Sequence, residues 1–169
     1  MPNTKKDKVQ YLDSIIKETI GEELLLPEEL ILYEPFINYS MDSCDISIAS
    51  HKIYTHINVS CGSCLGEIEL WEELIPQFDK LGVPIIMICV SDDEFILFEY
   101  LCEENKFENY SFPFFFDKND EYVKLNIFME EDNGFKTVLT DKENNILLLG
   151  NPINSIKIKE LFLEKVKPN

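Results

Sequence analysis

The hydrophobic and polar positions of residues 1–50 predict one helix followed by short elements. Apolar residues recur at helical spacing over residues 9–25, which is typical of an amphipathic helix, and Pro27 is expected to end it. Residues 30–50 are expected to be irregular or short-strand material, with Leu30–Tyr33 as one apolar run and Ser47–Ser50 as a candidate short strand. The apolar stripe of the helix consists of Val9, Leu12, Ile15, Ile16, Ile20 and Leu24.

The pattern becomes regular after residue 51, where apolar strands alternate with amphipathic helices. The segment Pro84–Val90 is apolar on both faces, as in a parallel strand buried between two layers. Ser91 is positioned to cap the next helix, and Pro76 is expected to break or kink the preceding helix near Ile75. The predicted elements are strands over 53–59, 84–90, 112–116, 137–140 and 146–149, and helices over 64–81, 92–105, 121–125 and 154–166.

This order of elements predicts an α/β fold with a central mixed sheet flanked by helices. The crossover rule makes the first two strands parallel, with a right-handed connection between them. At 169 residues the chain suits one compact domain with modest additions. We expect residues 51–169 to form that domain, and residues 1–50 to form a helical and short-strand extension packed on it.

The chain is strongly acidic, with a net charge of −17, 32 acidic residues and 15 basic residues that are all lysines. Nucleic acids and anionic membrane surfaces are bound through clustered Lys and Arg, so we expect the chain to bind neither. We interpret the charge as a contribution to solubility. No stretch reaches the roughly 18 apolar residues of a membrane span. The basic opening residues also lack the apolar core of a signal peptide.

The cysteines are too few and too unevenly placed for a disulfide-stapled secreted scaffold. Only Cys61 and Cys64 have a spacing that predicts a mechanism, because they stand three apart where a strand meets a helix. Half of a zinc site is a weaker interpretation, since the chain has no second Cys-x-x-Cys. A structural or vestigial disulfide is the other alternative. We interpret Cys89 and Cys102 as inert packing thiols, and Cys44 as distant from the pair.

The strand-to-helix junction favours thiol–disulfide exchange. Cys61 is predicted at or just before the helix start, where unpaired N–H groups and the helix dipole stabilise an anion. Such a position lowers a thiol pKa and makes the thiolate the attacking group. Cys64, one turn later and less exposed, can then attack a mixed disulfide at Cys61 and release the product.

The charges around this junction limit how far the Cys61 pKa is expected to fall. No lysine lies between Lys52 and Lys80, whereas four glutamates crowd the predicted helix. Stabilisation of the thiolate then comes mainly from the helix start and the amides of Gly62 and Ser63. We therefore expect a moderately lowered pKa and a reducing couple. The glutamates are Glu67, Glu69, Glu72 and Glu73.

Three segments carry a resemblance to a known family: Ile57–Glu67, Phe112–Asp117 and Thr137–Lys142. They resemble the thioredoxin-like redoxins, specifically the thiol–disulfide oxidoreductases related to alkyl hydroperoxide reductase and thiol-specific antioxidant. The ending Leu149–Ile153 is similar to a branch seen in thioredoxin-like proteins of the cell envelope. The resemblance, which runs from residue 52 to residue 166, implies a thioredoxin fold.

The resemblance also implies roles for residues of the motif. The family's first cysteine is the nucleophile and its second is the resolving thiol, and these correspond to Cys61 and Cys64. A glutamate three residues after the second cysteine commonly handles protons in the family, and Glu67 matches it. A solvated acid on the helix surface is an equal alternative for Glu67.

Two positions depart from the family's pattern. The tryptophan that usually precedes the motif is Ser60 in this chain. The family's cis-proline, which packs beside the dithiol and shapes substrate docking, falls on Phe135. We expect a substrate to dock against Ser60, Phe135 and the neighbouring Lys136.

The leading interpretation is a thiol–disulfide oxidoreductase, and specifically a reductase of protein disulfides that serves cell redox homeostasis. The alternative is a non-catalytic binding module of thioredoxin fold whose dithiol is vestigial, because the docking proline is absent. A peroxidase is disfavoured. Asn58 stands where related enzymes have a threonine, and the chain has no arginine to polarise peroxide.

The same interpretation sets the expected partners and surroundings. We expect a monomer without cofactor or metal that exchanges with a protein disulfide or dithiol and with a redox donor protein. The resemblance favours the cell envelope with an export signal removed, and the cytoplasm is the alternative. Trp71 is interpreted as a core residue, and His56 as a buried or edge histidine whose hydrogen bonds are satisfied rather than as a ligand.

Overall fold

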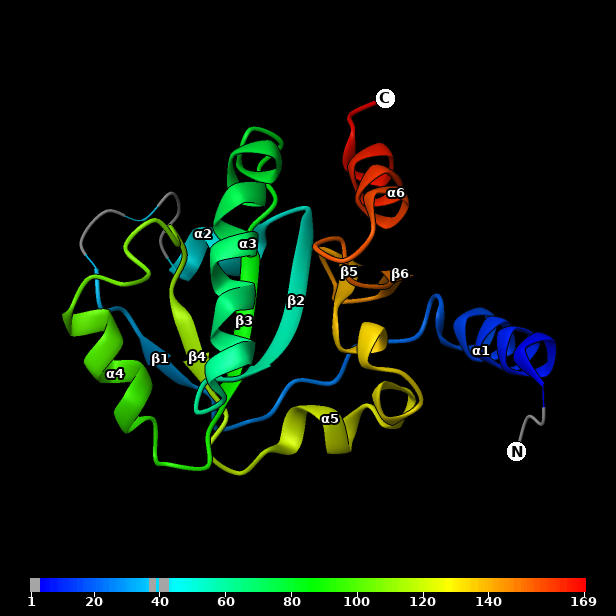
Figure 1. Cartoon of the computed structure of the whole chain (residues 1–169). Helices are drawn as coiled ribbons and strands as arrows, with labels where there is room; N and C mark the ends of the chain where they lie inside the picture. Colours follow the sequence, from blue (N-terminus) through cyan, green and yellow to red (C-terminus); the bar gives the residue numbers. More distant parts are fainter. Residues whose placement is uncertain (1–3, 37–38, 40–42) are drawn as a thin grey trace.

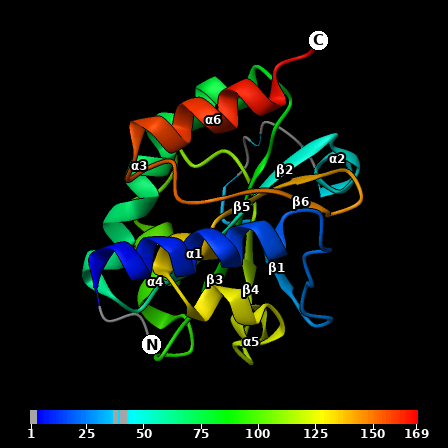
Figure 2. The same ribbon diagram turned by 90° about the vertical axis from the view of Figure 1, so that its right-hand side faces the viewer.

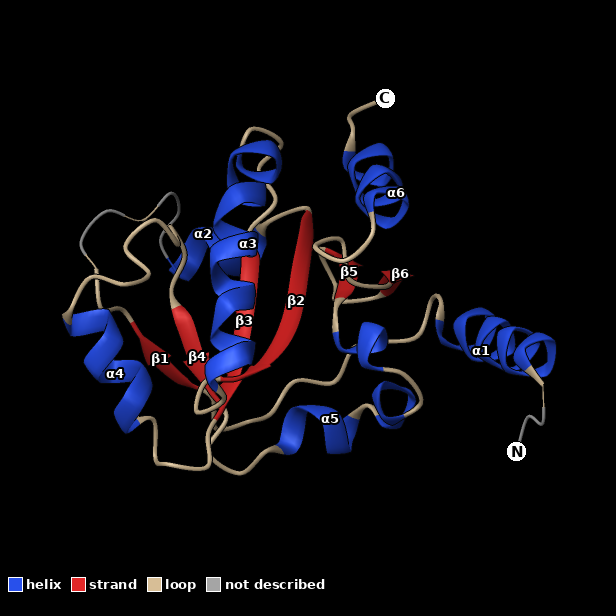
Figure 3. Cartoon of the chain, in the orientation of Figure 1, coloured by secondary structure: helices blue, strands red, loops and turns tan. Residues whose placement is uncertain are grey.

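The computed structural model of the chain describes residues 4–36, 39 and 43–169, in which helices surround a six-stranded mixed sheet (Figures 1 and 3). The helices are α1 (Lys5–Thr19), α2 (Ser43–Ile48), α3 (Gly62–Asp79), α4 (Ile96–Glu103), α5 (Glu121–Leu125) and α6 (Ile156–Val166), with short 3₁₀ helices η1 (Ile127–Glu130) and η2 (Asn133–Lys136). The strands are β1 (Ile31–Tyr33), β2 (His51–Asn58), β3 (Ile85–Val90), β4 (Phe114–Phe116), β5 (Val138–Asp141) and β6 (Ile146–Leu149).

The strands lie in the order β1-β4-β3-β2-β5-β6. The pairs β2–β3 and β3–β4 are parallel, whereas β1–β4, β2–β5 and β5–β6 are antiparallel. β3 occupies the middle of the sheet and is almost entirely buried, as its two-sided apolar pattern predicts. The predicted central mixed sheet flanked by helices is therefore confirmed.

Helices cover the sheet on both of its faces. α3 and α4 lie on one face and α2 on the other, as the two perpendicular views agree (Figures 1 and 2). α6 packs beside α3, where Leu70 and Ile156 line a shared hollow between the two helices. Among the described residues, no helix combines the length and the apolar character needed to cross a membrane. The fully buried core includes Trp71, Phe78, Phe98, Phe107, Tyr110, Phe112, Phe114 and Tyr122.

α3 runs without a break through Pro76, so of the break or kink expected near Ile75 the break is wrong. A proline removes one backbone donor and crowds the preceding turn, which costs about 3 kcal/mol in a helix interior. Here Ile75 is buried before the proline and Phe78 is buried after it. Burying two such side chains stabilises the fold by a comparable amount, about 1.5–3 kcal/mol each, and thereby keeps the helix continuous.

The N-terminal helix differs from its predicted bounds at both ends. Thr4 caps the start of α1 by accepting a hydrogen bond from the N–H of Asp7 at 3.1 Å. The helix ends at Thr19 rather than at Pro27, because Gly21 takes the left-handed φ of 92° and donates its N–H to Ile146 O at 2.8 Å. Pairing with β6 thus ends the helix before the apolar pattern does.

Two other elements also differ from expectation. The candidate strand over Ser47–Ser50 is wrong, because α2 occupies most of that segment. α4 begins at Ile96, four residues after the predicted start, because Glu94 and Phe95 both take positive φ angles of 57° and 68°. Ser91 therefore does not cap α4, and its Oγ instead accepts the N–H of Phe95 at 2.9 Å. Of the irregular or short-strand material expected over 30–50, the apolar run forms the short strand β1, and the predicted helix over 121–125 is confirmed.

Candidate dithiol site

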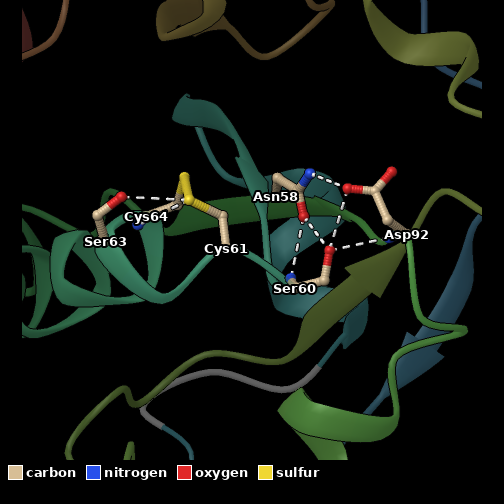
Figure 4. Close-up of a disulfide and its surroundings, with 6 residues drawn as sticks. All are labelled: Asn58, Ser60, Cys61, Ser63, Cys64 and Asp92. Carbon is tan, nitrogen blue, oxygen red and sulfur yellow. Dashed lines mark hydrogen bonds between the residues drawn. A yellow bond between two sulfur atoms is a disulfide. The ribbon is translucent and has the colours of Figure 1, made fainter.

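The dithiol lies where the sequence predicts it, between the end of β2 and the start of α3 (Figure 4). Cys61 is the N-cap residue of α3, and Cys64 lies in the first helical turn. The two sulfurs are joined as a disulfide, and the two Cα atoms are 5.2 Å apart, within the ordinary range for such a bond. Both cysteines are half-buried, so an approaching group can reach the pair.

Two donors lie at the sulfur of Cys61. The N–H of Cys64 donates to Cys61 Sγ at 3.4 Å, and Ser63 Oγ lies 3.3 Å from the same sulfur. When the disulfide opens, these groups and the helix N-terminus favour negative charge on Cys61. Ser63 thus acts through its hydroxyl group, whereas the sequence pointed to the amides of Gly62 and Ser63.

Glu67 follows Cys64 by one helical turn on α3 and is half-buried. Burial raises the pKa of this carboxyl above its ordinary value, because desolvation disfavours the charged form. A carboxyl group of raised pKa exchanges protons more readily at pH values closer to neutral.

Three polar side chains form a hydrogen-bonded network beside the turn that leads to Cys61 (Figure 4). The network connects the end of β2 with the end of β3. Ser60 donates from its N and from its Oγ to Asn58 Oδ1, at 2.9 and 2.6 Å. Asn58 Nδ2 donates to Asp92 Oδ2 at 2.9 Å. The N–H of Asp92 donates to Ser60 Oγ at 2.9 Å, which closes the network.

Sequence reasoning missed Asp92 as part of this site. The register of the parallel pair β2–β3 places Asn58 opposite Val90. Ser60 and Asp92 each follow these partners by two residues, so they meet beyond the carboxyl ends of the strands. Groups at these ends of parallel strands regularly come together, and this was the signal that could have identified Asp92.

The three expected docking residues lie in two different places. Ser60 is in the turn before Cys61, whereas Phe135 and Lys136 belong to η2. The ring of Phe135 is buried, with 6% of the residue exposed, and Lys136 is half-buried. Among the described residues, no hydrogen bond or ion pair joins η2 to the Cys61 turn.

His56 lies on β2, and its side chain is 11% exposed. Its ring stacks on Tyr122 with centroids 6.2 Å apart, and its Nε2 lies 3.7 Å from Asp120 Oδ1. That nitrogen is buried without a hydrogen-bond partner, so the expectation of a satisfied histidine is wrong. Burial, together with the nearby charge of Lys136, lowers the pKa of His56.

The other described thiols lie in the core. Cys89 is on β3 with 0% exposure and Cys102 is on α4 with 2%. Burial raises the pKa of Cys102 to about 12 and raises that of Cys89 well above its ordinary value. Cys44 belongs to α2, and its side chain falls outside the described part of the structure. Trp71 is 1% exposed, which confirms its assignment to the core.

A groove of about 380 Å³ opens beside the dithiol, between α3 and α4. Gly62 and Gly66 form part of its α3 side, and Leu97 and Leu101 line the α4 side. An ion pair between Glu69 and Lys106 lies along the same groove. Sequence reasoning did not place Lys106 near α3, because the two segments meet only in the folded chain.

No protein-family model matches the chain, and no curated protein matches it by sequence. Solved structures do match. A candidate thiol:disulfide interchange protein DsbE from Chlorobium tepidum matches with a TM-score of 0.58 and 13% identity, over 88% of this chain and 98% of that chain. Mycobacterium tuberculosis AhpC matches with a TM-score of 0.57 and 16% identity, over 88% of this chain and 92% of that chain.

A third structure is the thioredoxin domain of a thiol-disulfide oxidoreductase from Bacteroides vulgatus. It matches with a TM-score of 0.50 and 14% identity, over 85% of this chain and 97% of that domain. These likenesses show that the chain has the thioredoxin fold, as its resemblance to the thioredoxin-like redoxins implied. The Cys-x-x-Cys pair lies at the junction of β2 and α3 within that fold.

Proposed function

We propose that the protein is a thiol–disulfide oxidoreductase that reduces disulfides of other proteins. The observation that carries this proposal is the placement of Cys61 at the N-cap of α3, with its sulfur accepting the N–H of Cys64. A thiolate at a helix N-terminus is stabilised by the dipole and by unpaired N–H groups. Cys64 stands within bonding distance for the second exchange step.

The reaction consists of two exchanges in which two electrons pass to the substrate. The Cys61 thiolate attacks one sulfur of a substrate disulfide, which forms a mixed disulfide and expels a substrate thiolate. The Cys64 thiol then loses its proton, attacks Cys61 Sγ and releases the second substrate sulfur. The products are the Cys61–Cys64 disulfide and a substrate dithiol that has gained two protons. A donor dithiol protein restores the reduced form by the reverse exchange.

Glu67 is the group we propose to take the proton from Cys64. It lies three residues after Cys64 on the same helix, and its raised pKa suits a group that gains and loses a proton during turnover. Its partial burial limits competition from bulk water.

We propose that a substrate docks over the Cys61 turn and along the groove beside α3. We expect the substrate to contact Ser60, which is half-buried next to Cys61, and the positive charge of Lys136 on η2. Since the ring of Phe135 is buried, a substrate would meet the backbone of η2 at that position. Gly62 and Gly66 leave the α3 side of the groove open.

The test is the reduction of insulin by dithiothreitol. The wild-type protein is expected to accelerate insulin precipitation, whereas Cys61→Ser is expected to lose the acceleration. Cys102→Ala is the matched control, because it removes a thiol away from the dithiol and should keep the wild-type rate. Equal rates for the wild type and Cys61→Ser would reject the enzyme and favour the non-catalytic binding module.

Two further measurements define the reaction. Cys64→Ser should accumulate a mixed disulfide with a protein substrate, because the resolving thiol is absent. Equilibration with glutathione should give a midpoint nearer about −270 mV than about −120 mV, the values of strong reductants and strong oxidants. A midpoint above about −150 mV would make the protein an oxidant.

We propose the cell envelope as the compartment, on the ground that the Leu149–Ile153 ending is similar to envelope thioredoxin-like proteins. Fractionation of the source cells with an antibody against the chain tests this location. Recovery in the cytoplasmic fraction would reject it.

A further inference from the structure

We propose that Asp92 is a positioning residue of the dithiol, one that acts on Cys61 through Ser60. Its hydrogen bonds hold the turn that presents Cys61, and its carboxylate charge opposes the Cys61 thiolate. The inference rests on the proposed oxidoreductase function and deepens it, because it names the group that keeps the couple reducing.

The hydrogen bonds around Ser60 leave little freedom in this turn. The single hydroxyl proton of Ser60 goes to Asn58 Oδ1 at 2.6 Å, while its oxygen accepts the N–H of Asp92. The Asn58 amide uses its oxygen toward Ser60 and its nitrogen toward Asp92, so its orientation is defined. Each member of the network is hydrogen-bonded to the other two, at an exposed edge of the molecule. These mutual hydrogen bonds hold the turn before Cys61.

The network lies beside Cys61, so the charge of Asp92 affects the stability of the Cys61 thiolate. Ser60 precedes the attacking cysteine directly, and its side-chain oxygen also lies 3.3 Å from Asp92 Oδ2. Asp92 is hydrogen-bonded to the residue that precedes Cys61, and a negative charge close to a thiol raises the free energy of its thiolate. A less stabilised thiolate makes the dithiol the less favoured form and the couple more reducing.

The other charged groups near this turn do not have the same connection. Glu94 and Lys118 line a hollow of about 460 Å³ together with Asp92. Glu67 lies on α3 beyond Cys64, and Lys136 lies on η2 near His56. Asp92 alone among these is hydrogen-bonded to the residue before Cys61.

Substitutions can separate the geometric role from the charge. Asp92→Asn keeps an oxygen that accepts from Asn58 and removes the charge. Asp92→Glu keeps the charge. Ser60→Ala keeps the charge of Asp92 but removes the bridge to it. Glu94→Gln is the matched control, since it removes one carboxylate from the same loop without touching Ser60.

The experiment measures the alkylation rate of Cys61 by iodoacetamide against pH in the reduced, folded protein. We expect Asp92→Asn to shift the midpoint down by about half a pKa unit, which is about threefold more thiolate below the midpoint. The glutathione equilibrium should move toward the dithiol in the same variant. Asp92→Glu and Glu94→Gln should retain the wild-type profile. Ser60→Ala should lose several-fold in insulin reduction without the downward shift.

Identical alkylation profiles for the wild type and Asp92→Asn would overturn the inference, and so would equal shifts in Asp92→Asn and Glu94→Gln. Neither result would touch the proposed function, provided that the wild type reduces insulin. Conversely, a shifted profile in Asp92→Asn, in a protein that fails to reduce insulin, would reject the function and support the role of Asp92. Retained thermal unfolding of each variant shows that the profiles come from the folded state.

Discussion

Cys61 and Cys64 lie half-buried at the start of α3, whereas Cys89 and Cys102 lie in the core with 0% and 2% exposure. Backbone and hydroxyl donors point at Cys61, and polar side chains surround the turn before it. Around Cys89, in contrast, the neighbouring strands place Ile57 on one side and Phe116 on the other. The same type of side chain therefore has opposite surroundings in two regions of the molecule.

The difference shows that reactivity is a property of the surroundings of a thiol. Burial raises the pKa of a thiol, and for Cys102 this effect outweighs the hydrogen bond with Tyr33, which lowers the pKa. A helix N-terminus at a partly open edge does the reverse. The following changes test how far this contrast holds, beginning with the largest expected effect.

In the reduced, folded protein, iodoacetamide should label Cys61 at least about 1,000-fold faster than Cys102 near pH 7.5, because burial leaves almost none of Cys102 as thiolate. Mass spectrometry of the labelled peptides measures the ratio. Labelling in denaturant is the control, since all five cysteines should then react at similar rates. Comparable labelling of Cys61 and Cys102 in the folded protein would remove the contrast.

Cys89→Ser should lower the free energy of unfolding by about 1–3 kcal/mol, because it places a hydroxyl group in an apolar site. Urea unfolding of the reduced proteins measures the change. The rate of insulin reduction should remain that of the wild type while the variant is folded. Cys64→Ser is the opposite case, expected to lose turnover with little loss of stability. A reversal of these two results would contradict the assignment of roles.

Glu67→Gln should slow insulin reduction several-fold by removing a proton acceptor near Cys64. The same change has a predictable effect on stability. Because burial raises the folded-state pKa of Glu67, the wild type loses stability as the pH rises from the unfolded pKa through the folded one. Glu67→Gln removes that loss of stability. The free energy of unfolding of this variant should therefore exceed that of the wild type above the folded-state pKa of Glu67, and the difference should vanish below the unfolded-state pKa.

Urea unfolding at several pH values measures this difference, and Glu73→Gln, an exposed glutamate on the same helix, is the matched control. A slowed reaction in both variants would mean that the charge of α3 matters rather than Glu67 itself. An unchanged reaction in Glu67→Gln would leave it as a solvated acid on the helix.

Gly66→Ala should stabilise the protein by up to about 1 kcal/mol, because alanine favours a helix interior over glycine. No heavy atom lies within 4 Å of the position its Cβ would take, so the dithiol side of α3 has room. Gly150→Ala is the contrasting variant. There φ is 137° and the added Cβ would lie 2.9 Å from Ile158 Cδ1, so destabilisation is expected. Thermal unfolding compares both variants, and a loss of stability in Gly66→Ala would contradict the open groove.

Elements with strong local signals were predicted from the sequence. The apolar segment 84–90 became β3 with little change, and the short helix over 121–125 became α5. The junction of strand and helix at Cys61 also follows from local pattern, since an apolar strand runs directly into the start of an amphipathic helix. Periodicity over neighbouring residues carries this information.

Other features depend on contacts between distant parts of the chain. The end of α1 at Thr19 follows from hydrogen bonds to the β5–β6 hairpin, and α3 continues through Pro76 because its flanks are buried. α4 starts late because Phe95 takes a left-handed backbone conformation, in which its ring stacks on Phe116 of β4. Local helix propensity does not include contacts between distant segments. The ends of these helices therefore could not be predicted from the spacing of apolar residues alone.

The α/β fold class, the dithiol and its place at a helix start follow from the amino-acid sequence, because each depends on patterns within a few residues. The groups that surround that dithiol follow only from the folded arrangement. It brought Asp92 to Ser60 and Lys106 to Glu69, and it left His56 Nε2 without a hydrogen-bond partner. These arrangements arise where strands and helices distant in sequence meet, and the pairing of such elements is set by the packing of the whole core.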